Sequence, residues 1–362
     1  MPEPAPVHPV SRVHLDELSD DTGVFQHANG RRPDPRHGYC TDDVARALSV
    51  DLLHARELGW VAVAPSVERG IRFLSAAFDP AAGRFRNFRR SDGSWVDGPG
   101  SEDAHARALL ALGEAVAALP AGSLLDRVSG LFAAALPAAL ELTYIRPRAV
   151  ALLACVSADG ADAGTVGAAG RLIANSLWVA CEPARFDPDW PWPEHAATYE
   201  NGVVPRALIV GGVALGRPRM LGLGLAMLDW LLEQQVDAAG HLSPVGNRGW
   251  WPRGRSPARF DQQPIEATSL LLAAAAAHDA TGSDRYLQAM EAAYAWYLGT
   301  NDLGLPVAEP SRGAAFDGLG PAGVNANQGA ESTLMWLTAL EVIRRRRGSG
   351  VVPARGLVGA AR

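Results

Sequence analysis

Acidic side chains stand near the beginnings of five alanine- and leucine-rich stretches of this sequence. They are Asp42, Asp43, Glu102, Asp103, Glu200, Glu266 and Glu331. Helices that lie side by side present their first turns on one rim, so carboxylates far apart in the sequence can converge on one cleft. Two such carboxylates can cleave a glycosidic bond, because one protonates the glycosidic oxygen while the other activates water or attacks the anomeric carbon. The pattern predicts carbohydrate chemistry, with candidate catalytic residues Asp43, Asp103, Glu266 and Glu331.

The first two acidic pairs each follow a loop that contains residues suited to sugar binding. Residues 36–43 read RHGYCTDD, and residues 100–107 read GSEDAHAR. Thr41 and Ser101 can each cap a helix, and acids in the next positions favour the helix dipole without any further function. The glycine, tyrosine and histidine of the first loop are not needed for capping and suit a sugar-binding surface. The expected substrate-binding residues here are His37, Tyr39, Asp42, Glu102 and His105.

Glu102 and His105 are three residues apart and share one helix face, a spacing that metal ligands also use. No second set of spaced ligands accompanies them. We therefore expect no metal at this site, and the sequence calls for no other cofactor.

Three later loops combine tryptophan, amide and acidic side chains. The tryptophans of the proline-rich run WPWPEH (190–195) either stack on pyranose rings or pack in the core. The run FDQQPIE (260–266) packs amides and acids closely, as hydroxyl recognition requires, and Pro264 fits a first helical turn. The expected substrate-binding residues of these loops are Trp192, Glu200, Trp250, Trp251, Arg253, Asp261, Gln262, Gln263, Asn327 and Gln328.

The elements that must position these residues are almost all helices. Hydrophobic periodicity predicts helices over 41–58, 64–78, 102–119, 123–140, 145–158, 162–181, 201–216, 218–235, 263–280, 283–299 and 328–347. Pairing them gives hairpins whose first helices begin near residues 41, 102, 146, 201, 263 and 328. Six hairpins predict an all-α fold, an (α/α)6 toroid, in which the first helix of each pair lines the inside.

Closure of the toroid needs a sixth second helix. We expect it from Val10 to Leu18 or from the tail after Val351. The alternative architecture is an open helical solenoid, which the lack of a repeated sequence signature disfavours. The expected organisation is an N-terminal extension (1–19), a single domain (20–347) and a C-terminal tail (348–362).

Composition excludes several classes of protein. The 362 residues carry a net charge of −6, so a nucleic acid or an anionic membrane surface is not an expected partner. All 33 basic residues are arginine, which excludes Schiff-base chemistry and a P-loop. No secretory signal or membrane span is expected, so we expect a cytoplasmic protein. The three cysteines are expected to be buried free thiols.

Six longer strings resemble a bacterial family whose members occur alone or fused to glycosyltransferases. The strings are DTGVFQHA, RHGYCTDD, GSEDAHARAL, GNRGWWPRG, FDQQPIEA and NQGAES, and the resemblance extends from Asp20 to Leu340. Members of that family are placed with six-hairpin, glycosidase-like proteins, so the resemblance implies the toroid and a glycosyltransferase as a partner. Glu200 stands where the resemblance leads us to expect aspartate.

The predicted function is a glycoside hydrolase that acts on an oligosaccharide or glycoside. A sugar epimerase or isomerase could use the same fold with His105 or His37 as acid or base. A glycoside phosphorylase could bind phosphate near Arg253 and Arg259. A non-catalytic glycan-binding partner of a glycosyltransferase would keep the tryptophans and should survive loss of the acids.

Overall fold

A computed structural model describes residues 4–158 and 164–348 of the chain. The chain forms two compact units, which we name after their helices. The α2–α7 unit contains residues 18–26, 34–158, 164–177 and 345–348. The α8–α12 unit contains residues 4–17, 27–33 and 178–344.

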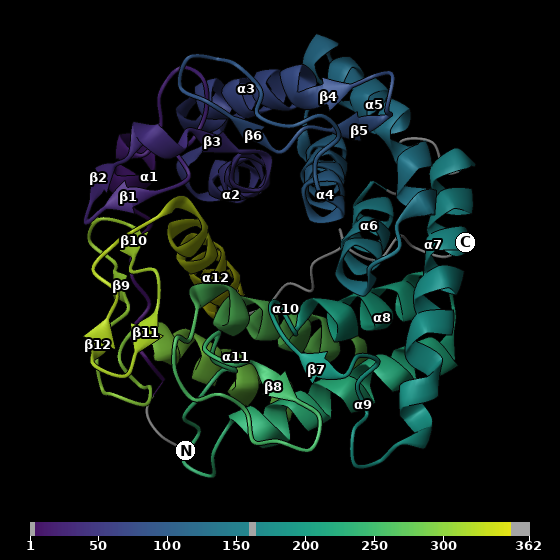
Figure 1. The fold of residues 1–362 in the computed structure, drawn as a ribbon, viewed down its shortest axis with the longest axis vertical. Coiled ribbons are helices and arrows are strands. Elements are labelled where there is room, and N and C mark those ends of the chain that lie inside the picture. Colours follow the sequence, from purple (N-terminus) through teal and green to yellow (C-terminus); the bar gives the residue numbers. More distant parts are fainter. Residues whose placement is uncertain (1–3, 159–163, 349–362) are drawn as a thin grey trace. The chain divides into compact units, whose positions relative to one another are not determined.

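The α2–α7 unit is built from helical hairpins. Its helices are α2 (Thr41–Leu58), α3 (Trp60–Ala77), α4 (Glu102–Ala118), α5 (Ser123–Ala135), α6 (Ile145–Ser157) and α7 (Thr165–Cys181, whose last four residues belong to the other unit). The unit also contains two short 3-10 helices, η1 (Pro35–His37) and η2 (Leu136–Glu141). Its strands form two antiparallel pairs, β3 (Tyr39–Cys40) with β6 (Phe88–Arg89) and β4 (Phe78–Asp79) with β5 (Arg84–Phe85). Helix α4 packs between α2 and α6 (Figure 1), so the first turns of α2 and α4 belong to neighbouring helices.

The α8–α12 unit repeats this organisation with longer loops. Its helices are α1 (Val13–Glu17), η3 (Glu182–Phe186), α8 (Val203–Ala214), α9 (Pro218–Gln235), α10 (Pro264–Thr281), α11 (Asp284–Tyr297) and α12 (Ala330–Gly348, whose last four residues belong to the other unit). Its two-residue antiparallel pairs are β1 (Ala28–Asn29) with β2 (Arg32–Pro33), β7 (Ala196–Ala197) with β8 (Trp251–Pro252), β9 (Ala308–Glu309) with β10 (Ala314–Ala315) and β11 (Leu319–Gly320) with β12 (Gly323–Val324). Helix α10 packs against α8, and the Thr268 hydroxyl on α10 donates to the Met335 carbonyl oxygen on α12.

The predicted first helices are confirmed in number and position. They begin at Thr41, Glu102, Ile145, Val203, Pro264 and Ala330, each within two residues of the expected start. Helix α10 is buried at every position from Pro264 to Leu271, including the polar residues Glu266, Thr268 and Ser269. All three cysteines are free and buried, also as predicted.

The N-terminal segment packs against α11 and α12. The Tyr294 hydroxyl donates to the Pro6 carbonyl oxygen at 3.1 Å, and the Arg344 guanidinium donates to that of His8 at 2.9 Å. The imidazole of His14 on α1 lies 2.9 Å from the Gln328 carbonyl oxygen. Helix α1 (Val13–Glu17) lies inside the range expected for the sixth second helix, whereas the alternative, the tail after Val351, lies outside the described residues.

One segment of the described residues could cross a membrane by its length and composition, although no membrane span was expected from the sequence. Ser123–Glu141 is long and apolar enough by length and composition. A single such segment is weak evidence, and here the chain forms α5 up to Ala135 and continues as the 3-10 helix η2, which contains Pro137.

Close backbone packing between α8 and α9 yields a stability prediction. A Cβ atom at Gly212 would lie 2.6 Å from the Leu221 backbone nitrogen, which cannot move like a side chain. Gly212→Ala should therefore lower the free energy of unfolding by about 1–3 kcal/mol, measured by urea unfolding. The matched control is Gly222→Ala on α9, where the added methyl meets nothing within 4 Å and should be neutral or stabilising. Equal free energies of unfolding for the two variants would contradict this close packing of α8 and α9.

Candidate functional site

Glu102 binds the backbone immediately before the neighbouring helix α6. Its Oε2 accepts the N–H groups of Thr143 at 2.8 Å and Tyr144 at 3.0 Å, and its Oε1 accepts the Thr143 hydroxyl at 2.7 Å. Helix α6 begins at Ile145 and has no side-chain cap of its own. The backbone N–H groups at a helix start need acceptors, so Glu102 fastens a helix other than its own.

This contact affects the acidity of Glu102. Burial opposes ionisation, but the hydrogen bonds from Tyr144 and Thr143 outweigh it and lower the pKa of the carboxyl group below its ordinary value of 4.5. A carboxylate whose two oxygens both accept hydrogen bonds from protein is poorly placed to bind a sugar hydroxyl. The structure therefore gives Glu102 a structural role in place of the expected substrate-binding one.

Glu266 makes the equivalent contact in the α8–α12 unit. Its carboxylate accepts the backbone N–H groups of Glu200 and Asn201, the latter at 3.2 Å, and the Asn201 side-chain amide at 3.0 Å. These residues precede α8, while Glu266 lies in the first turn of α10. Glu266 is 1% exposed and both of its oxygens are engaged, which argues against the expected role as a catalytic acid.

Asp43 and Asp103 lie in the first turns of α2 and α4, which pack against each other. Asp43 is 4% exposed, and its Oδ1 lies 3.1 Å from a guanidinium nitrogen of Arg46. Asp103 is half-buried. Asp42 is half-buried too, and its enclosed Oδ1 accepts no hydrogen bond from the described residues. The α2–α7 unit therefore presents carboxylates on two adjacent first turns.

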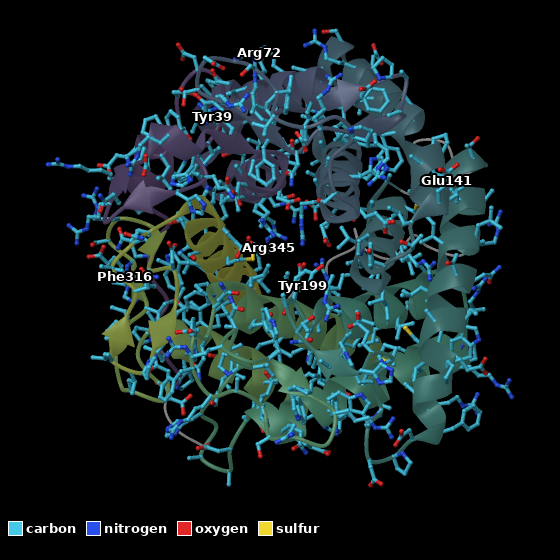
Figure 2. The ribbon with its side chains drawn as sticks, viewed as in Figure 1. Tyr39, Arg72, Glu141, Tyr199, Phe316 and Arg345 are labelled. Atoms are coloured by element: carbon cyan, nitrogen blue, oxygen red, sulfur yellow. The ribbon has the colours of Figure 1, made fainter. Side chains whose placement is uncertain are left out.

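Tyr39 is part of the core of the α2–α7 unit. It lies on β3 (Figure 2), is 2% exposed and stacks on Phe25 with ring centroids 4.8 Å apart. Its hydroxyl donates to Asp20, and burial together with this contact raises the pKa of Tyr39 to about 12. The ring is covered by protein, which argues against the expected contact with a sugar.

The two histidines expected near these acids differ in exposure. His105 is 0% exposed, packs against Phe85 with ring centroids 5.6 Å apart, and its pKa is lowered to about 4 by burial. Protein atoms enclose the His105 ring, which argues against direct contact between this side chain and a bound sugar. His37 is exposed beside Asp34, with nitrogen and oxygen 3.7 Å apart.

The tryptophans form an aromatic cluster. Trp251 stacks on Trp230 with centroids 4.5 Å apart, and Trp190 meets both rings edge-on. Trp192 is 3% exposed and stacks on Trp230 at 6.3 Å. Core packing, one of the two interpretations left open for the tryptophans of residues 190–195, thus describes Trp192. Trp251, which was expected to bind substrate, is buried as well, while Trp250 stays partly exposed.

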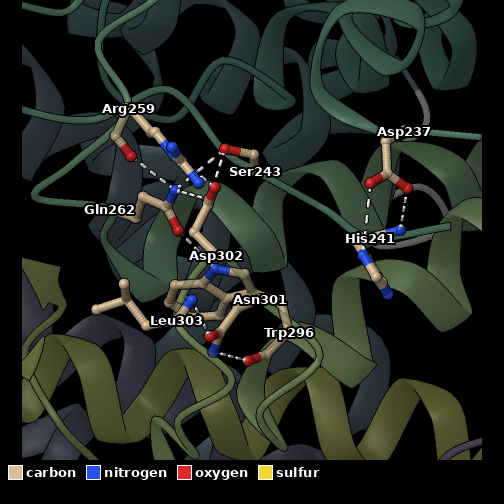
Figure 3. Close-up of polar contacts among 9 residues, drawn as sticks. All are labelled: Asp237, His241, Ser243, Arg259, Gln262, Trp296, Asn301, Asp302 and Leu303. Carbon is tan, nitrogen blue, oxygen red and sulfur yellow. Dashed lines mark hydrogen bonds and ion pairs between the residues drawn. The ribbon is translucent and has the colours of Figure 1, made fainter. Parts of the chain in front are cut away.

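Gln262 is the centre of a buried polar network (Figure 3). Its amide nitrogen donates to Ser243, to the Arg259 carbonyl oxygen and to Asp302, and its oxygen accepts the Trp296 indole N–H at 2.9 Å. Gln262 is 0% exposed. Because both ends of the amide are used within the protein, the structure assigns Gln262 a structural role in place of the expected hydroxyl-binding one.

Asn327 and Gln328 hold the loop before α12. The Asn327 side chain accepts the N–H of Gly30 at 3.0 Å, and the Gln328 amide donates to Glu309. Gln328 is fully buried, which argues against the expected contact with substrate. Arg253 forms a largely exposed ion pair with Asp187.

Glu331 is half-buried in the first turn of α12. Burial and the nearby Glu331 carboxylate both raise the pKa of Tyr297, whose hydroxyl donates to the Pro264 carbonyl oxygen at 2.8 Å. Glu331 is thus placed close to the start of α10.

A cavity of about 460 Å³ opens beside the start of α10. The expected residues Asp261 and Gln263 line it. Asn247, Asp317 and Asn325 line it as well and were not among the chosen candidates. All three stand in the glycine-containing loops that hold the predicted residues, which is the signal that could have identified them.

Three strained backbone positions lie in the α8–α12 unit. Among the described residues, those other than glycine with a left-handed φ are Glu200 (49°), Trp250 (55°) and Asp261 (59°). Such conformations cost about 1–3 kcal/mol each and persist where the surroundings impose them, often at functional sites. All three were expected to bind substrate.

Within residues 4–158 and 164–348, no three histidine, cysteine, aspartate or glutamate side chains gather as metal ligands would.

Comparisons with known proteins define the fold. By sequence, the chain matches no family model and no curated protein. By structure, it is similar to a sugar epimerase from a ruminal bacterium (TM-score 0.73, 11% identity, covering 94% of this chain and 96% of that one). It is similar to cellobiose 2-epimerase from Bacillus thermoamylovorans B4167 (TM-score 0.70, 13% identity, 93% and 96% covered). It is also similar to a GH76 α-mannanase from Bacteroides thetaiotaomicron (TM-score 0.63, 11% identity, 93% of each covered).

The predicted fold class, an all-α (α/α)6 toroid, is confirmed by these structural neighbours. The open solenoid is set aside. Identities this low establish the fold alone, and the expected fusion to a glycosyltransferase stays a prediction.

The lowered pKa of Glu102 makes a prediction about pH. Because the pKa is lower in the folded than in the unfolded state, the carboxylate stabilises the fold above about pH 4.5, and this contribution is lost as the pH falls through the folded-state value. The stability difference between wild type and Glu102→Gln should be large at about pH 7 and should shrink at about pH 3.5. Paired urea-unfolding curves test this, and a difference independent of pH would contradict it.

Glu266→Ala should destabilise the protein strongly. The substitution leaves the buried N–H groups of Glu200 and Asn201 without their acceptor, at a cost of about 1–3 kcal/mol each. The control is Glu68→Ala at an exposed position of α3, which should change the unfolding midpoint little. A Glu266→Ala protein as stable as wild type but inactive would show that Glu266 acts in chemistry instead.

Proposed function

We propose that this protein is a carbohydrate-active enzyme and that it hydrolyses glycosidic bonds with Asp43 and Asp103. The observation that carries the proposal is the placement of these carboxylates in the first turns of α2 and α4, two helices in direct contact. The fold supports it, because solved structures of this fold include a mannanase and sugar epimerases.

The surroundings of Asp43 and Asp103 suggest different catalytic roles for the two residues. The Arg46 guanidinium places positive charge beside Asp43, which suits a carboxylate that acts as base or nucleophile. Asp103 would then be the acid that protonates the glycosidic oxygen. Its neighbour Glu102 cannot easily share this work, because both Glu102 oxygens accept hydrogen bonds from the turn before α6.

Sugar epimerisation or isomerisation is the second candidate. It is favoured by the structural likeness to a sugar epimerase and to cellobiose 2-epimerase. A reaction that uses His105 is disfavoured, because its ring is enclosed and packs against Phe85. His37 is exposed and stays the histidine candidate for this reaction. Phosphorolysis and glycan binding without catalysis stay as the remaining alternatives.

Product analysis by mass spectrometry tests the proposal. Wild type is incubated with a panel of oligosaccharides, with and without phosphate, and with free monosaccharides. We expect shortened oligosaccharides that do not need phosphate. Asp43→Asn and Asp103→Asn should each reduce the rate at least about 100-fold, because general acid–base catalysis contributes about 10²–10⁴-fold.

Glu102→Gln is the matched control, since it removes the charge of the residue next to Asp103 on the same helical turn. It should keep most of the activity at a temperature where it is folded. Conversion of free monosaccharides by wild type would replace hydrolysis with epimerisation or isomerisation. An inert wild type that still binds glycan would contradict an enzymatic role.

A further inference from the structure

We propose that the cavity beside α10 is a binding site for one neutral sugar ring. Its volume of about 460 Å³ lies within the range of about 300–1,000 Å³ that small-molecule sites occupy. All of its lining residues belong to the α8–α12 unit. The assignment does not depend on the catalytic roles of Asp43 and Asp103.

The polar lining matches the hydrogen-bonding character of a sugar. Asn247, Gln263 and Asn325 supply amides, which both donate and accept, and Asp261 and Asp317 supply carboxylates, which accept from hydroxyl groups. Each sugar hydroxyl needs a donor and an acceptor, so this mixture fits a polyhydroxylated ligand. Val324, which is partly exposed, adds apolar surface for the C–H face of the ring.

The charges of the lining exclude other ligand classes. None of the lining residues within the described ranges is cationic, and two are carboxylates, so a sugar phosphate or another anion would be repelled. Arg248 reaches Asp261 with nitrogen and oxygen 3.4 Å apart, but its side chain is 72% exposed. A bare Ca²⁺ ion needs six to eight oxygens at about 2.3–2.6 Å, a much tighter cage than this cavity.

Alternating side chains explain how FDQQP builds the site. Asp261 and Gln263 line the cavity, whereas Gln262 between them is buried in the network with Trp296 and Asp302. Gln262 therefore anchors the segment from behind. The same residue exchanges backbone hydrogen bonds with Leu319, at 3.1 and 2.8 Å, which holds the β11–β12 hairpin against the segment.

The strained Asp261 is held in place from both sides. Its φ of 59° is left-handed, and its carbonyl oxygen accepts the Asn247 N–H at 2.9 Å. Asp317, on the opposite loop, has its Oδ1 fixed by the Gly329 N–H at 2.7 Å. The Asp261 backbone and the Asp317 carboxylate are thus positioned before any ligand arrives, which lowers the entropic cost of binding.

Ligand-observed NMR titrations of the full chain test the site. The probes are D-glucose, D-mannose and D-galactose, with D-mannose 6-phosphate and CaCl₂ alone as separate arms. The Asp103→Asn background prevents turnover. We expect at least one neutral monosaccharide to bind.

Two variants should each weaken binding by about tenfold, the effect of about 1.4 kcal/mol. Gln263→Ala removes an amide that has no hydrogen bond to the described residues. Gly320→Ala adds a methyl 3.4 Å from Asp261 Oδ1, an ordinary contact that leaves the backbone in place. Gly222→Ala on α9 is the folded control and should bind as wild type does, with unfolding midpoints measured for all variants.

Four results would overturn the proposal. They are absence of binding by all three monosaccharides, equal binding by both cavity variants and the control, tighter binding of D-mannose 6-phosphate, or a thermal shift by CaCl₂ alone that the cavity variants abolish. A wild type that hydrolyses oligosaccharides while the variants bind normally would overturn the sugar site and leave the hydrolase. An inert wild type whose sugar binding depends on Gln263 would overturn the hydrolase and leave the sugar site.

Discussion

The structure depends on one recurring interaction, in which a carboxylate at a helix start accepts backbone N–H groups that precede a neighbouring helix. Glu102 on α4 does this for α6, and Glu266 on α10 does it for α8. Helix starts leave N–H groups without partners, and an anion also favours the positive end of the helix dipole. Each contact therefore sets the spacing of two adjacent first helices and the position of the loops that they carry.

Acids that take part in this interaction have a structural role. Both oxygens of Glu102 and Glu266 accept hydrogen bonds within the protein, which argues against their reaction with a sugar. The proposed catalytic pair, Asp43 and Asp103, rests on its place in the first turns of the packed helices α2 and α4. The contact of Glu266 with the backbone before α8 has a second effect in the α8–α12 unit. Glu266 holds the backbone of Glu200, one of three strained residues in that unit, and another of them, Asp261, lines the polar cavity.

Local sequence signals predicted the helices, whereas contacts distant in sequence decided the roles of the acids. Periodicity and capping residues placed all six first helices within two residues. The partners of Glu102 lie 41–42 residues away and those of Glu266 lie 65–66 residues away, beyond any local pattern. Trp192 and Trp251 pack around Trp230, a helical residue that no motif contained. Asn247, Asp317 and Asn325 look like ordinary turn residues until folding brings them to one cavity.

The central claim is that the carboxylates of α2 and α4 act on the glycosidic bond. A crystal structure of Asp103→Asn protein with an uncleaved oligosaccharide tests it most directly. The account predicts that the side chain at position 103 lies within hydrogen-bond reach, about 2.6–3.2 Å, of a glycosidic oxygen, with Asp43 facing the same sugar unit. An oligosaccharide bound without contact to either position would contradict the account.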